Sequence, residues 1–328
     1  MDVDDAPGVL AVLDREEDVF VLGGGSNLLV ADRGFDGVVL RLGDDEVVFH
    51  DQGCGDIVVE AAAGASWDDL VEDAVARDFA GIECLSGIPG LVGAAPIQNI
   101  GAYGQEVAEV ITAVTVVDRG DGSIEKIGAA DCGFGYRHSR FKAEPGRWIV
   151  TGVQLHLRRG GSPTIRYPGL QKELDARVPS GRPATLQDVR DAVLDVRASK
   201  SMVLSRTDPN RRSAGSFFTN PIVAPGVADA IDVEGVPRFP TDDGRVKLSA
   251  AWLIERAGFP RGYGEGPAGL STNHCLALVN RGGATAADLI SLAGTVRRGV
   301  RDTFGVTLVP EPVFLGFDRT AGELLDAP

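Results

Sequence analysis

Apolar residues along the chain form short runs and helical stripes that predict a mixture of strands and helices. Runs rich in aliphatic and β-branched residues predict strands at residues 19–22, 38–42, 58–61, 110–118, 124–127, 149–157 and 306–309. Apolar residues three and four positions apart predict helices that begin after Ser66, Thr185 and Thr285. Because strands precede, separate and follow these helices without regular alternation, the pattern predicts an α+β fold.

The stretch from residue 81 to residue 106, GIECLSGIPGLVGAAPIQNIGAYGQE, fits neither pattern. It carries no charge between its two glutamates, yet its glycines and prolines exclude an ordinary buried helix. Glycines let a ligand approach the main chain, and Gln98, Asn99 and Tyr103 add polar groups to an apolar floor. We therefore expect this stretch to bind a large, flat, partly polar molecule. The alternative is a glycine-rich turn that binds nothing.

A second glycine-rich segment, GGGSN at residues 23–27, follows the first predicted strand. Consecutive backbone N–H groups in such a turn can converge on an anion, so the segment is a candidate phosphate cradle. It is not the dinucleotide fingerprint, which would need glycine in place of Leu28, and it lacks the lysine of a P-loop. Taken alone, a glycine hairpin explains it equally well. The glycine-rich stretch further along the chain favours the phosphate site.

Charge and composition exclude several function classes. The chain has 328 residues and a formal net charge of −15, which argues against a nucleic acid or an anionic membrane as its main partner. The sequence shows no secretory signal, no apolar segment of spanning length and no cluster with metal-ligand spacing. The four scattered cysteines are typical of reduced thiols. We therefore expect a cytoplasmic protein without a bound metal, in which local arginines hold any anionic substrate.

Three polar residues are candidates for chemistry. Ser216 follows a glycine, but it lacks the second glycine of a nucleophile elbow and an adjacent histidine base, so its hydroxyl suits proton donation better than attack. Glu311 lies between two prolines that hold its backbone extended, either as a buried ion-pair partner or as a positioned catalytic acid. Arg137 could pair with Glu311 or bind a substrate carboxylate through two hydrogen bonds. From residue types alone, each functional role competes with a structural one.

Three other segments have plainer interpretations. Residues 134–142, FGYRHSRFK, are typical of a solvated basic loop when taken alone. His156 alternates with apolar residues in a predicted strand, so we expect it on the solvent face. A polar, turn-rich run at 205–213 indicates a domain boundary at its start.

Five motifs in series resemble one known family. They are GGGSNLLV at 23–30, GIPGLVGAAPIQNIGAYGQE at 87–106, FGYRHSRFK at 134–142, SAGSFFTNP at 213–221 and VPEPVFLG at 309–316. In this order, across nearly the whole chain, they resemble the UDP-N-acetylenolpyruvoylglucosamine reductases (MurB), and the region of Tyr167 looks like their longer, type I form. The resemblance implies an FAD-binding domain of the PCMH or vanillyl-alcohol-oxidase type at 1–158, a connecting segment at 159–204, a substrate-binding α+β domain at 205–317 and a tail at 318–328.

The resemblance also implies a reaction and its cofactors. NADPH would reduce bound FAD, and a hydride would then pass to UDP-N-acetyl-3-O-(1-carboxyvinyl)-glucosamine (UDP-GlcNAc-enolpyruvate), giving UDP-N-acetylmuramate for peptidoglycan synthesis. No nucleic acid, membrane or obligate protein partner is expected. The residues implied to contact the cofactor are Gly23, Gly24, Gly25, Ser26, Asn27, Leu28, Ser86, Gly87, Ile88, Pro89, Gly93, Ala94, Asn99, Gly101 and Tyr103.

The same resemblance assigns roles in the chemistry. Arg137 and Glu311 would polarise the substrate carboxylate, and Ser216 would give a proton to the second carbon, in agreement with the roles inferred from the residues. The residues implied to lie near the UDP-sugar or the nicotinamide are Tyr167, Lys200, Asn220 and His274.

The chain departs from the family pattern in two places. Relatives usually carry an N-terminal segment with Asn-Thr and a Gly-Gly strand, whereas only 22 residues precede the GGGSN turn here. We therefore expect that strand to be truncated, through a mis-set start or a real loss, with weaker FAD retention. Asn273 stands where many relatives have lysine, so we expect one phosphate or cofactor contact to be weaker. The alternatives are another FAD-linked oxidase of the same flavin fold, or an inactive module that binds flavin or UDP-sugar.

Overall fold

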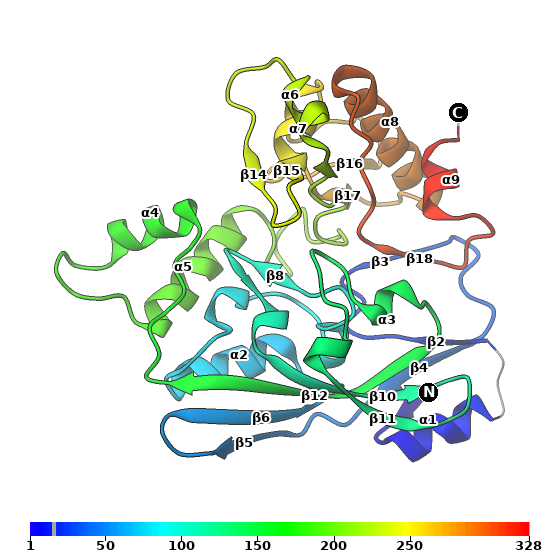
Figure 1. The fold of residues 1–328 in the computed structure, drawn as a ribbon. Helices are drawn as coiled ribbons and strands as arrows, with labels where there is room; N and C mark the ends of the chain where they lie inside the picture. Colours follow the sequence, from blue (N-terminus) through cyan, green and yellow to red (C-terminus); the bar gives the residue numbers. More distant parts are fainter. Residues whose placement is uncertain (15–17, 328) are drawn as a thin grey trace. The chain divides into compact units, whose positions relative to one another are not determined.

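The chain forms two compact units in a computed structural model that describes residues 1–14 and 18–327 (Figure 1). Unit 1 comprises Met1–Gly25 and Gly37–Ala198, and unit 2 comprises Ser26–Asp36 and Ser199–Pro328. Both units contain strands, helices and a buried apolar core, which confirms the α+β class. The finer division into four segments stays a prediction. Among the described residues, no helix has the length and apolar character needed to cross a bilayer.

A six-stranded sheet forms the centre of unit 1. Its strands follow the order β11–β10–β12–β6–β5, neighbouring strands are antiparallel, and β7 pairs with one end of β12. The strands are β5 (Val47–Asp51), β6 (Asp56–Ala62), β7 (Phe79–Ala80), β10 (Ile111–Asp118), β11 (Ile124–Gly128) and β12 (Trp148–Arg159). The apolar runs predict four of these six, β6, β10, β11 and β12, with bounds that differ by two residues at most, whereas β5 and β7 were not predicted.

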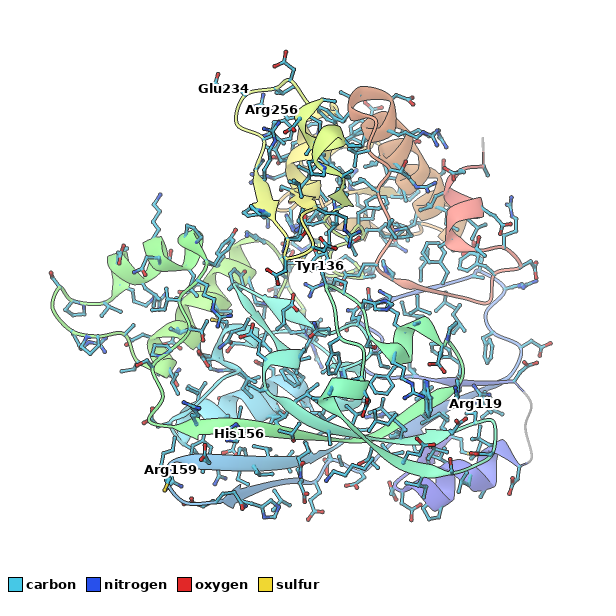
Figure 2. The ribbon with its side chains drawn as sticks, in the orientation of Figure 1. Arg119, Tyr136, His156, Arg159, Glu234 and Arg256 are labelled. Atoms are coloured by element: carbon cyan, nitrogen blue, oxygen red, sulfur yellow. The ribbon has the colours of Figure 1, made fainter. Side chains whose placement is uncertain are left out.

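In strand β12, the alternation of apolar and polar residues corresponds to a buried and an exposed face. Successive side chains of a strand point to opposite faces, and Val153, Leu155 and Leu157 are almost fully buried on one of them. His156 lies on the other face, where its Nε2 is 2.9 Å from the Oδ1 of Asp56, and its side chain remains 37% exposed (Figure 2). The prediction of a solvent-face histidine is therefore confirmed.

A smaller parallel sheet of unit 1 has the order β1–β4–β2. Its strands are β1 (Asp2–Val3), β2 (Val19–Val21) and β4 (Val38–Leu42). Helix α1 (Ala6–Leu13) follows β1, begins at an Asp5 cap and contributes Val9 and Val12 to a core shared with this sheet. The apolar runs at 19–22 and 38–42 predict β2 and β4, whereas no pattern in the sequence indicated β1 or α1.

Among the described residues, the remaining α-helices of unit 1 are three of 10 to 14 residues and one of four residues. Helix α2 begins after Ser66, whose hydroxyl accepts from the Asp69 N–H, and buries the predicted apolar face against the six-stranded sheet. The α-helices are α2 (Trp67–Ala76), α3 (Arg140–Ala143), α4 (Pro168–Arg177) and α5 (Leu186–Ser199). Single 3₁₀ turns occur at Glu83–Leu85, Val92–Ala94, Val107–Glu109 and Ala129–Asp131, and a small hairpin joins β8 (Gly101–Ala102) to β9 (Gln105–Glu106).

Unit 2 contains three small sheets and a long helix. The sheets are β13–β15–β14, β16–β17 and a parallel pair of β3 with β18. The strands are β3 (Leu28–Val30), β13 (Ile222–Val223), β14 (Arg238–Pro240), β15 (Val246–Leu248), β16 (Ala268–Leu270), β17 (Leu278–Asn280) and β18 (Val313–Leu315). The helices are α6 (Pro225–Asp229), α7 (Ala250–Arg256), α8 (Ala286–Phe304) and α9 (Ala321–Leu325).

Helix α8 matches its prediction, whereas the strand predicted after it is wrong. The Thr285 side chain and Asp288 form a reciprocal cap at the start of α8, and Gly305 ends it with a left-handed φ of 67°. Residues 306–309 are not a strand, although Val306 and Leu308 are buried. The prolines on either side of Glu311 have no N–H group to donate. Regular strand hydrogen bonding therefore begins only after them, at β18.

The central sheet of unit 1 gives a test of the packing. Leu155 is fully buried on β12, so Leu155→Ala is expected to lower the free energy of unfolding by about 2–5 kcal/mol through lost contacts and a residual cavity. The control is Ile124→Ala, because Ile124 is 53% exposed on the edge strand β11 and should change stability by less than about 0.5 kcal/mol. Urea unfolding followed by circular dichroism measures both. Equal losses would contradict the assignment of Leu155 to the core.

Candidate functional site

The two glycine-rich segments predicted to bind one ligand lie against each other in unit 1. A Cβ atom added to Gly24 would lie 2.7 Å from the Cα of Gly90, and one added to Gly23 would lie 3.5 Å from the Cβ of Ala94. Two main chains approach this closely only when a side chain is missing between them. Gly25 has a φ of 69°, in the left-handed region that glycine adopts without strain. The triple glycine therefore turns the chain at the edge of the longer stretch.

Glu83 anchors the start of the longer stretch although it is completely buried. Its carboxylate accepts hydrogen bonds from the N–H of Gly81 at 2.8 Å, the N–H of Thr164 at 2.7 Å and the Nε2 of Gln105 at 2.8 Å. The Oε1 of Gln105 in turn accepts from the N–H of Cys84 at 2.7 Å. One carboxylate thus joins three segments that are far apart in the sequence.

A second acidic anchor, Asp68, lies in the first turn of α2. It accepts two hydrogen bonds from Arg190 of α5, at 2.7 and 3.1 Å, and one from the N–H of Gly87 at 2.6 Å. Burial alone would raise the pKa of Asp68, but the hydrogen bonds from Arg190 and Gly87 hold it below its ordinary value. The side chain of Arg190 is only 7% exposed. This ion pair therefore ties α5 and α2 to the glycine-rich stretch.

The predicted catalytic residue Arg137 is held by main-chain carbonyls of the same stretch. Its Nη2 donates to the carbonyl of Gly101 at 2.6 Å and its Nη1 to the carbonyl of Asn99 at 3.3 Å. Arg137 has a left-handed φ of 51°, and Lys142 Nζ donates to its carbonyl at 3.1 Å. The basic segment at 134–142 is therefore packed onto the glycine-rich stretch, and its interpretation as a solvated loop is wrong.

Several predicted cofactor residues use their side chains inside the protein. Asn99 is 1% exposed, and its amide nitrogen donates to Glu106 at 2.7 Å and to the carbonyl of Gly135 at 3.0 Å. Ser86 is fully buried and donates to the carbonyl of Glu83 at 2.6 Å. These two side chains therefore already have hydrogen-bond partners inside the protein.

Tyr103 and Tyr167 are brought together in unit 1. Their rings meet edge to face with centroids 5.5 Å apart. Burial raises the pKa of the Tyr103 hydroxyl to about 12, whereas the side chain of Tyr167 is 41% exposed. A predicted cofactor residue and a predicted substrate residue therefore form one aromatic contact.

In unit 2, the structure brings together the segments that carry Ser216 and Glu311. Phe218 and Pro310 form an antiparallel bridge, and the N–H of Glu311 donates to the carbonyl of Phe217 at 2.9 Å. The amide of Asn27 donates to the carbonyl of Glu311 at 3.3 Å. Three residues predicted from three distant motifs thus lie in neighbouring backbone segments.

Two of the predicted substrate residues of unit 2, Lys200 and His274, interact with each other, and a third, Asn220, is bonded elsewhere in the fold. Asn220 accepts from the N–H of Ala250 at 2.9 Å, at the start of α7. Lys200 follows α5 and acts electrostatically on His274. Asn273 donates from Nδ2 to the Oγ of Ser201 at 2.9 Å, so it has a defined role inside the protein. The expected weakening of a ligand contact by Asn273 stays a prediction.

Sequence reasoning missed the residues that support these sites. Glu83, Asp68 and Arg190 were not assigned a function, and neither were Ser201 or Asn210. Glu83 had a usable signal, because it is the only charged residue between Gly81 and Gln105 in an otherwise apolar run. The partners of the other residues lie too far along the chain for any local pattern to indicate them. Among residues 1–14 and 18–327, no group of three or more metal-binding side chains occurs.

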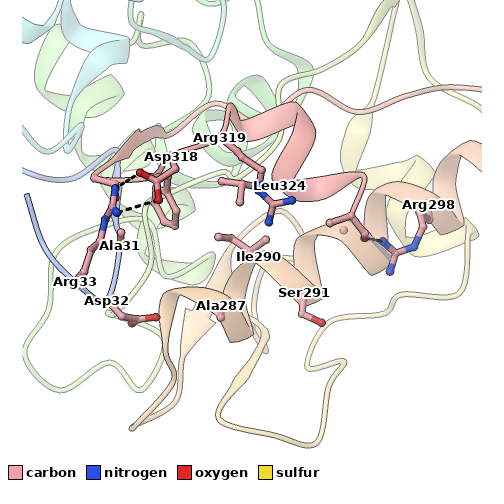
Figure 3. Close-up of a pocket in the computed structure, with 14 residues that line it drawn as sticks. Ala31, Asp32, Arg33, Ala287, Ile290, Ser291, Arg298, Asp318, Arg319 and Leu324 are labelled. Atoms are coloured by element: carbon pink, nitrogen blue, oxygen red, sulfur yellow. Dashed lines mark hydrogen bonds and ion pairs between the residues drawn. The ribbon is translucent and has the colours of Figure 1, made fainter.

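Unit 2 also contains a cavity of about 490 Å³ beside α8 and α9 (Figure 3). Arg33 and Asp318 form an ion pair with two hydrogen bonds at one edge, of 2.9 and 2.6 Å. Its lining includes Asp32, Ser291 and Arg298, but none of the residues predicted to contact cofactor or substrate. This cavity is therefore distinct from the predicted sites.

Comparisons with known proteins agree on one family. The model for the UDP-N-acetylenolpyruvoylglucosamine reductase C-terminal domain matches residues 208–315, and the model for an FAD binding domain matches residues 3–128. The chain is 50% identical over 315 residues to the UDP-N-acetylenolpyruvoylglucosamine reductase of Thermobifida fusca, covering 93% of this chain and 88% of that protein. It is 47% identical to the UDP-N-acetylenolpyruvoylglucosamine reductase of Mycobacterium marinum, and the match covers 95% of this chain and 88% of that protein.

A solved structure supports the same relationship. The crystal structure of UDP-N-acetylenolpyruvylglucosamine reductase (MurB) from Thermus caldophilus is 27% identical to this chain, with a TM-score of 0.64. The match covers 96% of this chain and 91% of that one.

The environment of His274 predicts a pH dependence of stability. Burial, with Lys200 and Arg261 nearby, lowers the pKa of His274 to about 4, while Glu255 acts in the opposite direction. Unfolded histidine has a pKa of about 6.5, so between these values the unfolded chain binds the proton more tightly. Above about pH 6.5, His274 is neutral in both states and its contribution to stability is fully present. As the pH falls from about 6.5 towards 4, the unfolded chain takes up the proton first, so the free energy of unfolding falls by at most about 3 kcal/mol.

The measurement compares the wild type with His274→Gln, which cannot take up this proton. Urea unfolding at several pH values between 4 and 7 should show a steeper loss of stability in the wild type. Carboxylates affect both proteins, so the difference between the two curves isolates His274. Parallel curves would contradict a neutral, buried imidazole.

Proposed function

The chain belongs to the UDP-N-acetylenolpyruvoylglucosamine reductase family, and from this premise we propose which of its residues hold the cofactor and the substrate. The protein is an FAD-dependent oxidoreductase that uses NADPH to reduce UDP-GlcNAc-enolpyruvate to UDP-N-acetylmuramate, a peptidoglycan precursor. The family predicted from the five motifs is confirmed, as is an FAD-binding domain followed by a second α+β domain. The observation that supports this function most directly is 50% identity, over 93% of the chain, to a named reductase.

The triple glycine and the longer glycine-rich stretch suit a flavin dinucleotide. The close approach of Gly24 to Gly90 supports this assignment, because a Cβ at Gly24 would fill the space between the two main chains. Consecutive N–H groups of residues 23–27 would hold the pyrophosphate, and residues 86–103 would contact the flavin rings largely through the main chain. Held by these residues, FAD would supply the hydride-transfer chemistry between NADPH and the substrate.

Arg137 is proposed to bind the carboxylate of the enolpyruvyl group. The carbonyls of Gly101 and Asn99 fix the orientation of its guanidinium, which costs no reorganisation during the reaction. Hydride addition to the vinyl group places negative charge on the neighbouring carbon and, through the enolate form, on the carboxylate. A guanidinium that is already in position stabilises this charge more in the transition state than in the ground state. We assign Glu311 to the same carboxylate.

Ser216 is proposed to give the proton that completes the reaction at the second carbon. Its neighbour Phe217 is 3% exposed and accepts the N–H of Glu311, so the Ser216 backbone is fixed relative to the Glu311 segment. The rings of Phe217 and Phe218, the next two residues, meet edge to face with centroids 5.1 Å apart. The sequence has no histidine next to Ser216, which argues against a nucleophilic role and favours proton donation.

Tyr167, Lys200, Asn220 and His274 are proposed to bind the UDP-sugar or the nicotinamide. The cationic Lys200 suits a diphosphate, and neutral His274 suits a hydrogen bond without added charge. We propose that the enzyme acts in the cytoplasm, without an obligate protein partner.

The glycine contact predicts the effect of a single methyl group on flavin retention. Gly24→Ala places a Cβ 2.7 Å from a main-chain atom, so the two segments must separate and the flavin content of the purified protein should fall by about tenfold or more. The control is Gly128→Ala, since a Cβ there meets nothing within 4 Å and φ is −68°. The ratio of flavin to protein absorbance measures retention, and circular dichroism verifies folding. Equal flavin content in a folded Gly24→Ala protein would contradict the cradle.

If Ser216 is the proton donor, its loss should affect only one of the two half-reactions. Ser216→Ala should leave flavin reduction by NADPH near normal, because no proton donation to carbon is involved. Reoxidation by UDP-GlcNAc-enolpyruvate should slow by about 10²–10⁴-fold. Anaerobic stopped-flow absorbance measures both steps, with Ser213→Ala as the control in the same segment. Equal losses in both half-reactions would remove Ser216 from the proton-donor role.

A further inference from the structure

The residue after Lys200 adopts an unusual backbone conformation. Ser201 has a φ of 58°, in the left-handed region, although it carries a side chain. It lies just beyond the end of α5 and is only 7% exposed. A residue other than glycine keeps this conformation only where its surroundings hold it. The path of the chain at Lys200 therefore depends on what fixes Ser201.

Two asparagine side chains fix Ser201 in unit 2. Asn273 donates from Nδ2 to the Ser201 Oγ at 2.9 Å, and Asn210 donates from Nδ2 to the same atom at 3.2 Å. These residues belong to separate loops, one before β13 and one between β16 and β17. The hydroxyl of Ser201 is therefore the point where both loops meet the segment that carries Lys200.

Both asparagines are themselves fixed. The Oδ1 of Asn210 accepts from the N–H of Thr272 at 3.1 Å, and Asn210 is 5% exposed. The Oγ of Ser271 accepts from the N–H of Asn273 at 3.1 Å and from the N–H of His274 at 3.3 Å. The turn at residues 271–274 is thus built as one hydrogen-bonded unit with Ser201, and His274 belongs to it.

The network places a cation beside a neutral imidazole. Lys200 precedes Ser201, and its charge, together with burial, disfavours the protonated form of His274. The surface of the chain as a whole is strongly acidic, with a net charge of −15. An anionic ligand therefore needs cations whose position is set locally, and a flexible lysine side chain gains little unless its backbone is fixed.

We propose that Asn210 and Asn273 are positioning residues, which hold the left-handed turn at Ser201 so that Lys200 is presented to the anionic diphosphate of the UDP-sugar. This inference rests on the proposed role of Lys200 in substrate binding. It gives Asn273 a function through Ser201, with no direct contact to the ligand. Removing either asparagine should raise the KM for the UDP-sugar, with little change in kcat at saturation.

Substitutions at Ser201 separate positioning from direct contact. Ser201→Ala removes the hydroxyl but keeps the Cβ, so the left-handed conformation loses its support. Ser201→Gly removes the same hydroxyl, but glycine takes this φ without strain. We therefore expect Ser201→Ala to raise KM more than Ser201→Gly, although alanine resembles serine more closely.

The experiment is a double-mutant cycle on the full-length FAD-loaded enzyme. Asn273→Ala alone should raise the KM for UDP-GlcNAc-enolpyruvate by about five- to tenfold, the range expected for one lost hydrogen bond. In the Ser201→Gly background, the same change should raise it by less than about twofold, because the acceptor is already gone. The rate of flavin reduction by NADPH is measured in parallel and should stay constant. Gln187→Ala, on an exposed face of α5, is the control for folding and loading.

Lys200→Met distinguishes failure of the inference from failure of the proposed function. A KM unchanged by Lys200→Met would remove Lys200 from substrate binding, and the positioning role would fall with it. A raised KM for Lys200→Met with an unchanged KM for Asn273→Ala would overturn the positioning role alone. An Asn273→Ala effect that persists in full beside Ser201→Gly would show that Asn273 contacts the ligand directly. If Asn273→Ala does not fold, a Ser201→Gly variant with a KM at or above that of Ser201→Ala overturns the proposal.

Discussion

The buried carboxylate of Glu83 is the constraint on which the flavin-binding half of this fold depends. A stretch rich in glycine loses more backbone freedom on folding than any other, and it contains little regular structure to offset that loss. The three hydrogen bonds accepted by Glu83, together with those accepted by Asp68, take the place of a sheet or helix ladder. Removing Glu83 would leave several buried donors unsatisfied, and each such donor costs about 1–3 kcal/mol. Rigidity in this stretch therefore comes from buried polar groups.

Hydrogen bonds within the protein also fix the segments that carry its cationic side chains. Arg190 is paired with Asp68, Arg137 is bonded to two carbonyls, and Lys200 precedes a turn held by two asparagines. On a chain with an excess of carboxylates, cations left on flexible side chains would pair with the nearest acid in solution. Hydrogen bonds within the fold keep the orientation of Arg190 and Arg137 independent of that background. This is a physical reason why residues that touch no ligand matter to the site.

The local elements could be predicted from the sequence because their causes are local. The alternation in β12 and the cap of α8 at Thr285 each depend on residues within a few positions, and the structure reproduces both. The strand predicted at 306–309 failed because two prolines later in the segment remove the donors of a ladder. The partners of Glu83 lie 22 and 81 residues away, so no periodicity could reveal them. The motifs predict which residues belong to the site, but they do not show where each side chain is bonded.

This distinction matters for how a family motif is interpreted residue by residue. Ser86 and Asn99 lie inside the motif that resembles a flavin-binding stretch, yet both side chains are bonded within the protein. Asn273 is predicted to depart from the family pattern, yet it too has a bonded partner in Ser201. Conformity to a motif therefore does not imply contact with a ligand, and departure from it does not imply a lost contact. What decides the role of each side chain is where its donors and acceptors go, because a buried polar group must be satisfied before it can serve a substrate.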